Sequence, residues 1–331
     1  MNDRPLAVLG AGAVGTILSA YLGKAGEKVA LVEGADGRRE QVAKDGLVVT
    51  GKVDNVLARP TNVLRSIEEL RDLKPSALFI CTKTWSLKTI LPALAKVLPT
   101  DTLVISFQNG IGPEDDVAEF FEPERVARGI VNLAGGVNPD GSVTMQWFNP
   151  PNYLGMLEDG SPDASARLDR VKDVLNGAHL TTKIVPSQET KKRAFFKTIL
   201  NSALTALCAS SGITMRQAMT YGHTRNMAHV LIREGLSVAA AVGYNYGEKA
   251  KEACMRYLDE GGDHLPSMWT DLQRGSPTEI EYINGKIVKI GLMFKNIDVD
   301  TNLFFTSMII TQEIKSGVRK PTEIPEYLTH F

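Results

Sequence analysis

The sequence has few cysteines and histidines, no long hydrophobic run and almost no net charge. Its three cysteines, Cys81, Cys208 and Cys254, are an odd and widely spaced set, which predicts neither a disulfide framework nor a zinc site. The five histidines show no H-x₃-H or H-E-x-x-H pattern, so we expect no bound metal. No apolar run approaches the roughly 18 residues that a membrane-spanning helix needs.

The balance of charge excludes two further classes of partner. Lys and Arg total 37 against 38 Asp and Glu, and the net charge of −1 leaves no footprint for nucleic acid or for an anionic membrane. Residues 1–5 lead directly into an apolar strand pattern, without the basic and apolar segments of a secretory signal. We therefore expect a cytoplasmic protein that acts on a small molecule.

A glycine-rich turn near the start is the first positive signal. The run from Leu6 to Gly15 reads LAVLGAGAVG, which places G-x-G-x-x-G between an apolar strand and a helical pattern. In a dinucleotide-binding turn, the first glycine permits the bend, the second lets backbone N–H groups approach a pyrophosphate, and the third lets the helix lie close to the strand. We assign cofactor binding to Gly10, Ala11, Gly12, Ala13, Val14 and Gly15.

The choice between NAD and NADP depends on the end of the second strand. Lys28–Val32 is apolar and rich in β-branched residues, and Glu33 follows it about 20 residues after the turn. A carboxylate there accepts hydrogen bonds from ribose hydroxyls and repels a 2′-phosphate, which favours NAD. Arg38 and Arg39 lie nearby and could reach a 2′-phosphate, so NADP stays open; all three could also be solvated surface charges.

The order of apolar patterns predicts an α/β fold with two domains. Apolar runs alternate with helical patterns up to about residue 186, as in parallel sheets with crossover helices, and helical patterns dominate afterwards. We predict a Rossmann-type dinucleotide-binding domain at 1–187 and a mostly α-helical substrate and catalytic domain at 188–331. Expected strands include 28–32, 47–50, 55–58, 77–81, 103–106, 126–131 and 181–185; expected helices include 38–44, 87–98, 164–176, 195–209, 228–244, 248–258, 279–293 and 301–316.

Three stretches of the sequence resemble the ketopantoate reductase (2-dehydropantoate 2-reductase) family. They are the opening GAGAVG, the run KTILN at 197–201, and SMWTD at 267–271 followed by TEIEYING at 278–285. The turns CTK at 81–83 and QNG at 108–110 also fit the family pattern. The resemblance implies a Rossmann domain that holds the nicotinamide cofactor, a helical domain that completes the substrate site in the cleft, and reduction of a 2-oxo acid to its (R)-2-hydroxy acid.

The resemblance points to Lys197 as the catalytic acid, and the chemistry agrees with that role. Hydride transfer to a ketone places negative charge on oxygen, so a positioned proton donor is needed. Lys197 lies in a largely apolar run, where we expect its ammonium group to be easier to deprotonate. Asn201 is one turn further on the same face and could hold the substrate hydroxyl. From the residues alone, a lysine that extends along an amphipathic helix is equally plausible.

Other site residues follow from the same resemblance. Glu279 matches the family glutamate that pairs with the lysine or the substrate hydroxyl, although a first-turn glutamate is also favoured by the helix dipole. Ser267 would bind the substrate carboxylate, while its place after Pro266 suggests a helix N-cap. Asp271, one turn later, could face the same cleft or be a surface carboxylate. Lys83 and Asn109 follow strand ends, Lys83 near the cofactor and Asn109 near both the cofactor and the substrate.

Two departures from the family pattern bear on specificity. Thr205 stands where the family usually has a second asparagine, which changes the predicted floor of the substrate pocket. Glu33 stands where the family commonly has an arginine for NADP. Both departures favour an NAD-using relative that acts on another branched or aromatic 2-oxo acid.

These observations predict an NAD(P)H-dependent reductase of 2-dehydropantoate or a related branched 2-oxo acid. An alternative is an NAD-dependent D-2-hydroxy acid dehydrogenase that works in the opposite direction. An alternative of another class is a non-catalytic dinucleotide sensor whose helical half binds a protein partner; the combination of Lys197, Asn201, Ser267 and Glu279 argues against it. The sequence leaves a homodimer open.

Overall fold

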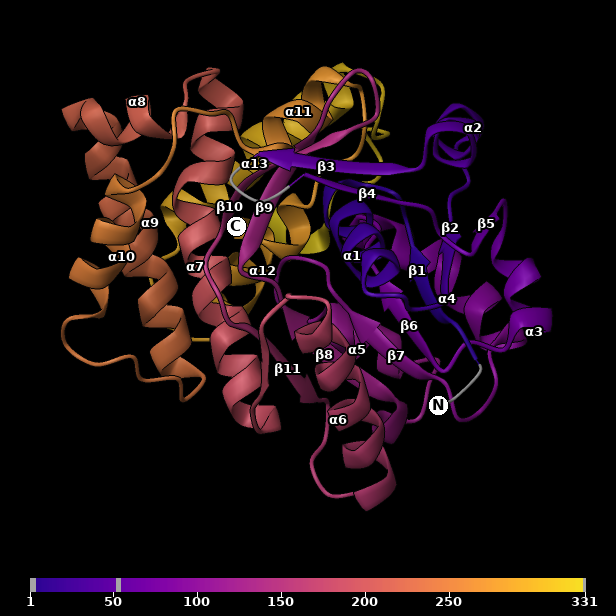
Figure 1. The fold of residues 1–331 in the computed structure, drawn as a ribbon. Helices are drawn as coiled ribbons and strands as arrows, with labels where there is room; N and C mark the ends of the chain where they lie inside the picture. Colours follow the sequence, from indigo (N-terminus) through magenta and orange to yellow (C-terminus); the bar gives the residue numbers. More distant parts are fainter. Residues whose placement is uncertain (1–3, 52–54, 330–331) are drawn as a thin grey trace. The chain divides into compact units, whose positions relative to one another are not determined.

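The computed structural model describes residues 4–51 and 55–329, and it divides into two compact units (Figure 1). The first unit is Met1–Gln108 with Gly112–Lys191, and the second is Asn109–Ile111 with Lys192–Phe331. The division at 191/192 falls inside helix α7 (Ser187–Ser211), which begins at the predicted domain boundary. An α/β first half and a mostly helical second half confirm the predicted fold class.

An eight-stranded sheet forms the centre of the first unit, in the order β12-β11-β8-β7-β6-β1-β2-β5. Six neighbouring strands, from β8 to β5, are parallel, whereas β11 runs antiparallel to β8 and parallel to β12. The central strands are short apolar runs that are buried along their whole length, as expected for a sheet covered on both faces. The strands are β1 (Leu6–Leu9), β2 (Val29–Val32), β5 (Asn62–Leu64), β6 (Ala77–Ile80), β7 (Leu103–Ser106), β8 (Val126–Ile130), β11 (Asn152–Met156) and β12 (Thr182–Ile184).

Helix α1 (Ala13–Lys24) packs between this sheet and a second, four-stranded one of order β4-β3-β10-β9. Ile17 and Leu22 of α1 belong to the same core as Val8 of β1 and Val143 of β10. The helix is therefore buried over most of its surface, which fixes the turn that precedes it. The second sheet consists of β3 (Leu47–Gly51), β4 (Val56–Ala58), β9 (Leu133–Val137) and β10 (Val143–Phe148).

The other face of the large sheet is covered by amphipathic helices. Leu87, Leu91 and Leu94 of α4 (Leu87–Val97) share a core with Ala7 and Ile80 of the sheet, and their spacing of three and four residues produces the apolar stripe. The remaining helical elements of this unit are α2 (Asp36–Asp45), η1 (Ile67–Glu69), α3 (Leu70–Leu73), η2 (Thr84–Ser86), α5 (Pro113–Ala118), η3 (Pro123–Arg125) and α6 (Pro162–Gly177).

The second unit is a helical assembly around α9, which contacts α8, α10, α12 and α13. Its core combines Leu231 of α9, Ile199 of α7, Ile287 of α12 and Ile309 of α13. The helical elements are α8 (Met215–Thr220), α9 (Gly222–Ala241), α10 (Ala250–Asp259), α11 (Ser267–Gln273), η4 (Ile280–Tyr282), α12 (Asn284–Gly291), α13 (Asp300–Lys315) and η5 (Glu326–Leu328). Within the described residues, no helix has the length and hydropathy needed to cross a membrane.

Strand β5 and the start of α12 are two of the places at which the structure differs from the sequence prediction. Strand β5 was not expected, because its three residues are too short to give a pattern. The single helix predicted at 279–293 is wrong: a short 3₁₀ turn, η4, comes first, and α12 begins only at Asn284. Ile283, between them, has φ −105° and ψ −99°, outside the helical region, so the apolar period continues through a break in the helix.

Candidate active site

The glycine turn after β1 has the geometry that its motif predicts. Gly10 has φ +98°, a conformation that residues with a side chain rarely adopt. A Cβ on Gly15 would lie only 1.9 Å from the carbonyl oxygen of Gly10, so only glycine lets α1 approach the strand this closely. Gly10 in turn lies against Thr82 at the end of β6, where a Cβ would meet the Thr82 methyl at 2.9 Å. The turn is therefore enclosed by α1 on one side and by the residues after β6 on the other.

Gly12, in contrast, has open space around it. It is the N-cap residue of α1, no side chain caps it, and a Cβ built on it would have no neighbour within 4 Å. Uncapped N–H groups at the start of a 12-residue helix favour an anion, through both hydrogen bonding and the helix dipole. This opening fits the pyrophosphate of a dinucleotide.

Glu33 is held between the glycine turn and the start of α2. Its Oε2 accepts a hydrogen bond from the Ala11 N–H at 2.9 Å, and its Oε1 accepts one from the Ala35 N–H at 2.8 Å. The carboxylate is half-buried at the end of β2, the position where ribose hydroxyls are bound in dinucleotide folds. Its remaining lone pairs suit those hydroxyls.

Arg38 has a structural role that the sequence did not reveal. Its guanidinium donates to the Ala11 carbonyl at 3.2 Å, to Thr16 Oγ1 at 2.8 Å, and to Gln41 and the Gly141 carbonyl. Burial lowers the pKa of Arg38, and the charge of Glu33 acts against that shift. Arg38 therefore braces the same turn that Glu33 holds.

A buried polar chain connects the ends of β6 and β7. Gln108 donates from Nε2 to the Thr82 carbonyl at 3.0 Å and accepts from Ser106 Oγ at 3.1 Å. Ser106 in turn accepts from Arg128, which lies 3.4 Å from the buried Glu114 carboxylate. The chain fixes the turn that carries Lys83, which is half-buried at the start of η2. Arg128 was not among the residues predicted for the site, although a single arginine within an apolar strand is a usable signal.

In the second unit, Lys197, Asn201 and Thr205 lie on one continuous helix, α7, at intervals of four residues, and so share a face. Lys197 and Asn201 are half-buried, and Thr205 is buried. The two residues before Lys197 pack against tyrosines: Phe195 on Tyr244, and Phe196 on Tyr246 with 4.9 Å between ring centroids. These pairs lie beside Lys197 along the chain, and the apolar setting of its ammonium group stays a prediction.

Ser267 and Asp271 lie on the short helix α11. Ser267 is exposed and Asp271 is half-buried. The N-cap role predicted for Ser267 is wrong, because Pro266 is the N-cap residue and Ser267 is the first residue of the helix. The proline ring restricts φ to the value that a helix start requires, so Pro266 forms the boundary itself.

Glu279 and Asn109 are brought to one segment of the second unit. Glu279 is buried and precedes η4, so it is not in the first turn of an α-helix, as the sequence suggested. Asn109 lies in the turn at 109–111, which belongs to this unit although the residues around it belong to the first. The Ile111 N–H donates to the Tyr282 carbonyl of η4 at 3.0 Å. No sequence signal pointed to this pairing.

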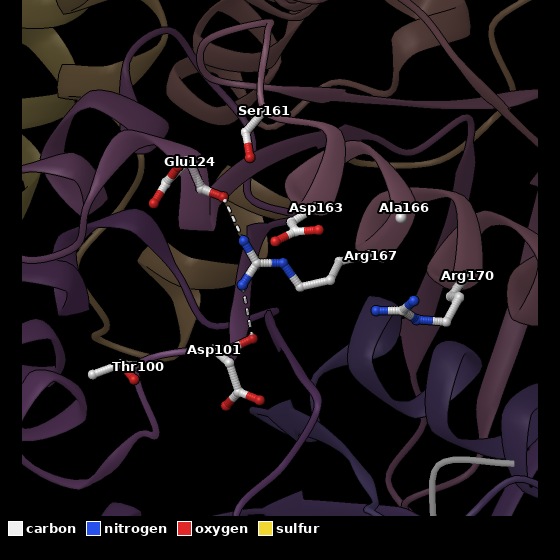
Figure 2. Close-up of a pocket in the computed structure, with 8 residues that line it drawn as sticks. All are labelled: Thr100, Asp101, Glu124, Ser161, Asp163, Ala166, Arg167 and Arg170. Carbon is white, nitrogen blue, oxygen red and sulfur yellow. Dashed lines mark hydrogen bonds between the residues drawn. The ribbon is translucent and has the colours of Figure 1, made fainter.

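A pocket of about 400 Å³ in the first unit lies away from these residues (Figure 2). Arg167 spans it and donates to the carbonyls of Asp101 and Glu124 at 3.1 and 3.3 Å. Both acceptors precede strands β7 and β8, so the pocket lies at the amino ends of the strands. Dinucleotides bind at the opposite, carboxyl ends. The pocket contains no predicted site residue.

Comparison with known proteins agrees with this geometry. The model of the ketopantoate reductase PanE/ApbA family matches residues 6–158, and that of its C-terminal domain matches residues 189–313. A 2-dehydropantoate 2-reductase of Pyrococcus abyssi is 28% identical over 94% of this chain and 98% of its own.

Solved structures share the fold over most of the chain. The ternary structure of D-mandelate dehydrogenase with NADH and anilino(oxo)acetate aligns with a TM-score of 0.84 at 24% identity, covering 95% of this chain and 99% of that one. A dimeric ketopantoate reductase from Staphylococcus aureus aligns with a TM-score of 0.75 at 23% identity, covering 95% and 100%. With both family models matched in order, the chain belongs to the ketopantoate reductase family, as the sequence resemblance predicted, and is an oxidoreductase that acts on CH–OH groups.

Proposed function

We propose that this protein reduces a branched or aromatic 2-oxo acid to the (R)-2-hydroxy acid with NADH. The proposal is carried by two features that occur together in this member of the family. One is the open glycine turn that Glu33 braces, and the other is Lys197 on α7, which follows two aromatic pairs in the chain. The turn accounts for a dinucleotide, and the lysine accounts for a proton donor.

Residues of the first unit, together with Asn109 of the second, fit the cofactor. Gly12 and the first N–H groups of α1 would hold the pyrophosphate, Glu33 the ribose hydroxyls, and Lys83 and Asn109 the nicotinamide end. The bound nicotinamide supplies the hydride that reduces the C2 carbonyl.

The chain's own part in the reaction is to supply a proton and to orient the substrate. As C2 is reduced, negative charge develops on the carbonyl oxygen, and Lys197 Nζ donates a proton to it. Asn201 holds the same oxygen through its side-chain amide, Glu279 orients the lysine or the new hydroxyl, and Ser267 binds the carboxylate. Asp271 lies one turn after Ser267 and completes this side of the site.

Thr205 supports a substrate other than 2-dehydropantoate. A threonine offers a shorter side chain with one hydroxyl where an asparagine offers an amide, so a pocket floored by Thr205 loses polar contacts and gains space. An aromatic 2-oxo acid uses such space best. The solved D-mandelate dehydrogenase, which shares this fold, was determined with an aromatic oxo acid, anilino(oxo)acetate.

A panel of 2-oxo acids tests the proposal directly. We expect NADH oxidation, followed at 340 nm, with branched or aromatic 2-oxo acids, and a smaller kcat/KM for 2-dehydropantoate. The reverse reaction, with D-2-hydroxy acids and NAD⁺, shows whether oxidation is the faster direction. Tight NADH binding without turnover on any acid would instead favour a non-catalytic sensor.

The cofactor preference gives a separate prediction. Wild-type protein should bind NADH at least about tenfold more tightly than NADPH, because the Glu33 carboxylate repels a 2′-phosphate by about 1.4 kcal/mol or more. In Glu33→Gln the ratio of the Kd for NADPH to the Kd for NADH should fall towards one, as measured by fluorescence titration with both cofactors. Glu40→Gln, the same change at an exposed position of α2, should leave the ratio unchanged. Tighter binding of NADPH by the wild type would overturn the NAD assignment.

The oligomeric state of the protein is a further proposal. The solved ketopantoate reductase of Staphylococcus aureus is described as dimeric, and we propose a homodimer for this chain as well. Sedimentation equilibrium at micromolar concentration would show it.

A further inference from the structure

The segment from Thr278 to Ile283, which carries Glu279, is held by contacts from outside it. It contains only a 3₁₀ turn, η4, and its backbone leaves the helical region at Ile283. Inside the segment, the amides of Tyr282 and Ile283 donate to the Glu279 carbonyl at 3.1 and 3.2 Å. A single turn of this kind is weak by itself, so its position depends on its neighbours.

Glu313 of α13 is the first of those neighbours. Its side chain is fully buried, and its Oε1 accepts hydrogen bonds from both the N–H and the hydroxyl of Thr278, each at 2.7 Å. The Thr278 hydroxyl oxygen also accepts from the Ile280 N–H at 3.3 Å. Thr278 therefore links the buried carboxylate to the backbone on both sides of Glu279.

Glu313 and its contacts with Thr278 form a clamp on this segment, and Arg319 extends the clamp to the far side of Glu279. Its Nε donates to Glu313 Oε2 and its Nη2 donates to Glu281 Oε1, both at 2.7 Å. Burial opposes the charge of Arg319, but its hydrogen bonds to the two carboxylates raise the pKa of Arg319 overall. Nη1 donates to the Glu323 carbonyl, which ties the C-terminal tail to the same cluster.

The turn at 109–111 is held by the other end of the segment. Besides the hydrogen bond from Ile111 to the Tyr282 carbonyl, Gly110 packs so closely that a Cβ on it would lie 2.5 Å from that carbonyl oxygen. Gly110 also has φ +94°. Asn109 thus takes its position from η4, about 170 residues later in the sequence.

We propose that Glu313 and Arg319 are positioning residues of the active site, which act through Thr278 and η4 to fix Glu279 and, through the Tyr282 carbonyl, Asn109. This inference rests on the proposed reductase function. A buried ion pair contributes little to stability compared with an apolar replacement, so a gain in geometric definition is the stronger reason to retain one here. The clamp predicts that loosening Thr278 affects catalysis more than folding.

Threonine-to-valine substitution isolates the clamp. In Thr278→Val the hydroxyl is lost while the side-chain shape is kept, and kcat/KM for the 2-oxo acid should fall at least about tenfold, mainly through kcat. The KM for NADH should stay within about twofold, because the glycine turn is untouched. Thr278→Ser, which restores the hydroxyl, should recover most of the activity.

Thr224→Val is the matched control. Thr224 is also buried in the second unit, and its hydroxyl donates to the carbonyls of Ala218 and Tyr221 at the junction of α8 and α9. It should lower the melting temperature by an amount similar to Thr278→Val and leave kcat/KM within about twofold. Equal activities of the two valine variants would overturn the proposal.

Hydrogen exchange separates this inference from the proposed function. In Thr278→Val, the amides of Ile111, Tyr282 and Ile283 should exchange at least about tenfold faster, and in Thr224→Val they should not change. This readout needs no substrate. An inactive wild type would refute the reductase function alone, whereas unchanged exchange at these amides would refute the clamp in an active or an inactive enzyme.

Gly110→Ala tests the second half of the clamp. Its Cβ would overlap the Tyr282 carbonyl oxygen, so the turn carrying Asn109 must move. We expect a loss of kcat at least as large as in Thr278→Val. The Kd for NADH should rise by less than about tenfold, because only the contact of Asn109 with the nicotinamide end is displaced and the glycine turn is untouched. Activity equal to wild type would show that the contact with η4 does not position Asn109.

Discussion

Substitution of Lys197 by alanine will lower kcat for the 2-oxo acid by about 10²- to 10⁴-fold, the range that a positioned general acid supplies. The Kd for NADH should change by less than about twofold, because the lysine lies in the second unit and the glycine turn in the first. Both quantities follow from stopped-flow turnover and fluorescence titration on the same preparation.

The control for this variant is a lysine on the same helix. Lys192 lies five residues earlier, about 140° around α7, with its Nζ 5.5 Å from the Tyr246 ring centroid. Lys192→Ala removes the same charge and should leave kcat within about twofold. Added alkylammonium ions should restore part of the activity of Lys197→Ala, since a small amine can occupy the vacated space. Retained kcat in Lys197→Ala would remove the residue from the mechanism.

Local features of the fold were predictable from the sequence. The strands around the glycine turn are short buried apolar runs, and α4 repeats leucine at helical spacing, so neighbouring residues alone determine these elements. The requirement for glycine at Gly10 and Gly15 follows in the same way, from a bend and a close approach between adjacent elements. Family motifs added the candidate residues Lys197 and Glu279, whose roles stay predictions.

What could not be predicted depends on contacts between distant parts of the chain. The 3₁₀ turn before α12 keeps the apolar period of a helix, and the carboxylate that anchors Thr278 at its start belongs to Glu313, 35 residues later in the sequence. Arg38 looked like a phosphate ligand because charge and sequence distance cannot reveal that its guanidinium already holds Thr16 and Ala11. The role of a charged residue depends on the groups that it contacts in the folded protein, and those contacts cannot be read from the sequence.

The threonine in the family motif at 278–285 illustrates the same point. A motif match uses Thr278, Asn284 and Gly285 to identify the family, but it gives no physical reason for any of these residues. In the structure Thr278 binds Glu313, Asn284 donates to the Ser202 carbonyl at 3.0 Å, and a Cβ on Gly285 would meet the Tyr327 hydroxyl. Thr278 and Asn284 fix the backbone at the two ends of the segment that carries Glu279, and Gly285 permits a close approach, so the motif describes a structural support as well as the proposed catalytic residue.

Gly12→Asp should make the protein more stable and at the same time prevent cofactor binding. Gly12 has φ −68° and ψ −173°, the extended conformation of a helix N-cap, and there is room for a side chain. An aspartate there can accept an N–H of the first turn and interact favourably with the helix dipole, for a gain of about 0.5–1 kcal/mol and about 2 °C in Tm. The same carboxylate would occupy the pyrophosphate position, so the Kd for NADH should rise by more than about 100-fold.

Two further variants separate the contributions of charge, bulk and capping to this result. Gly12→Ala adds bulk without charge and should weaken NADH binding by less than Gly12→Asp. Tyr221→Asp places the same carboxylate at the N-cap of α9, which also has an extended conformation and no side-chain cap, so it should stabilise the protein and leave NADH binding unchanged. Since capping alone predicts only the rise in Tm, NADH binding by Gly12→Asp at the wild-type affinity would show that the dinucleotide does not occupy this turn.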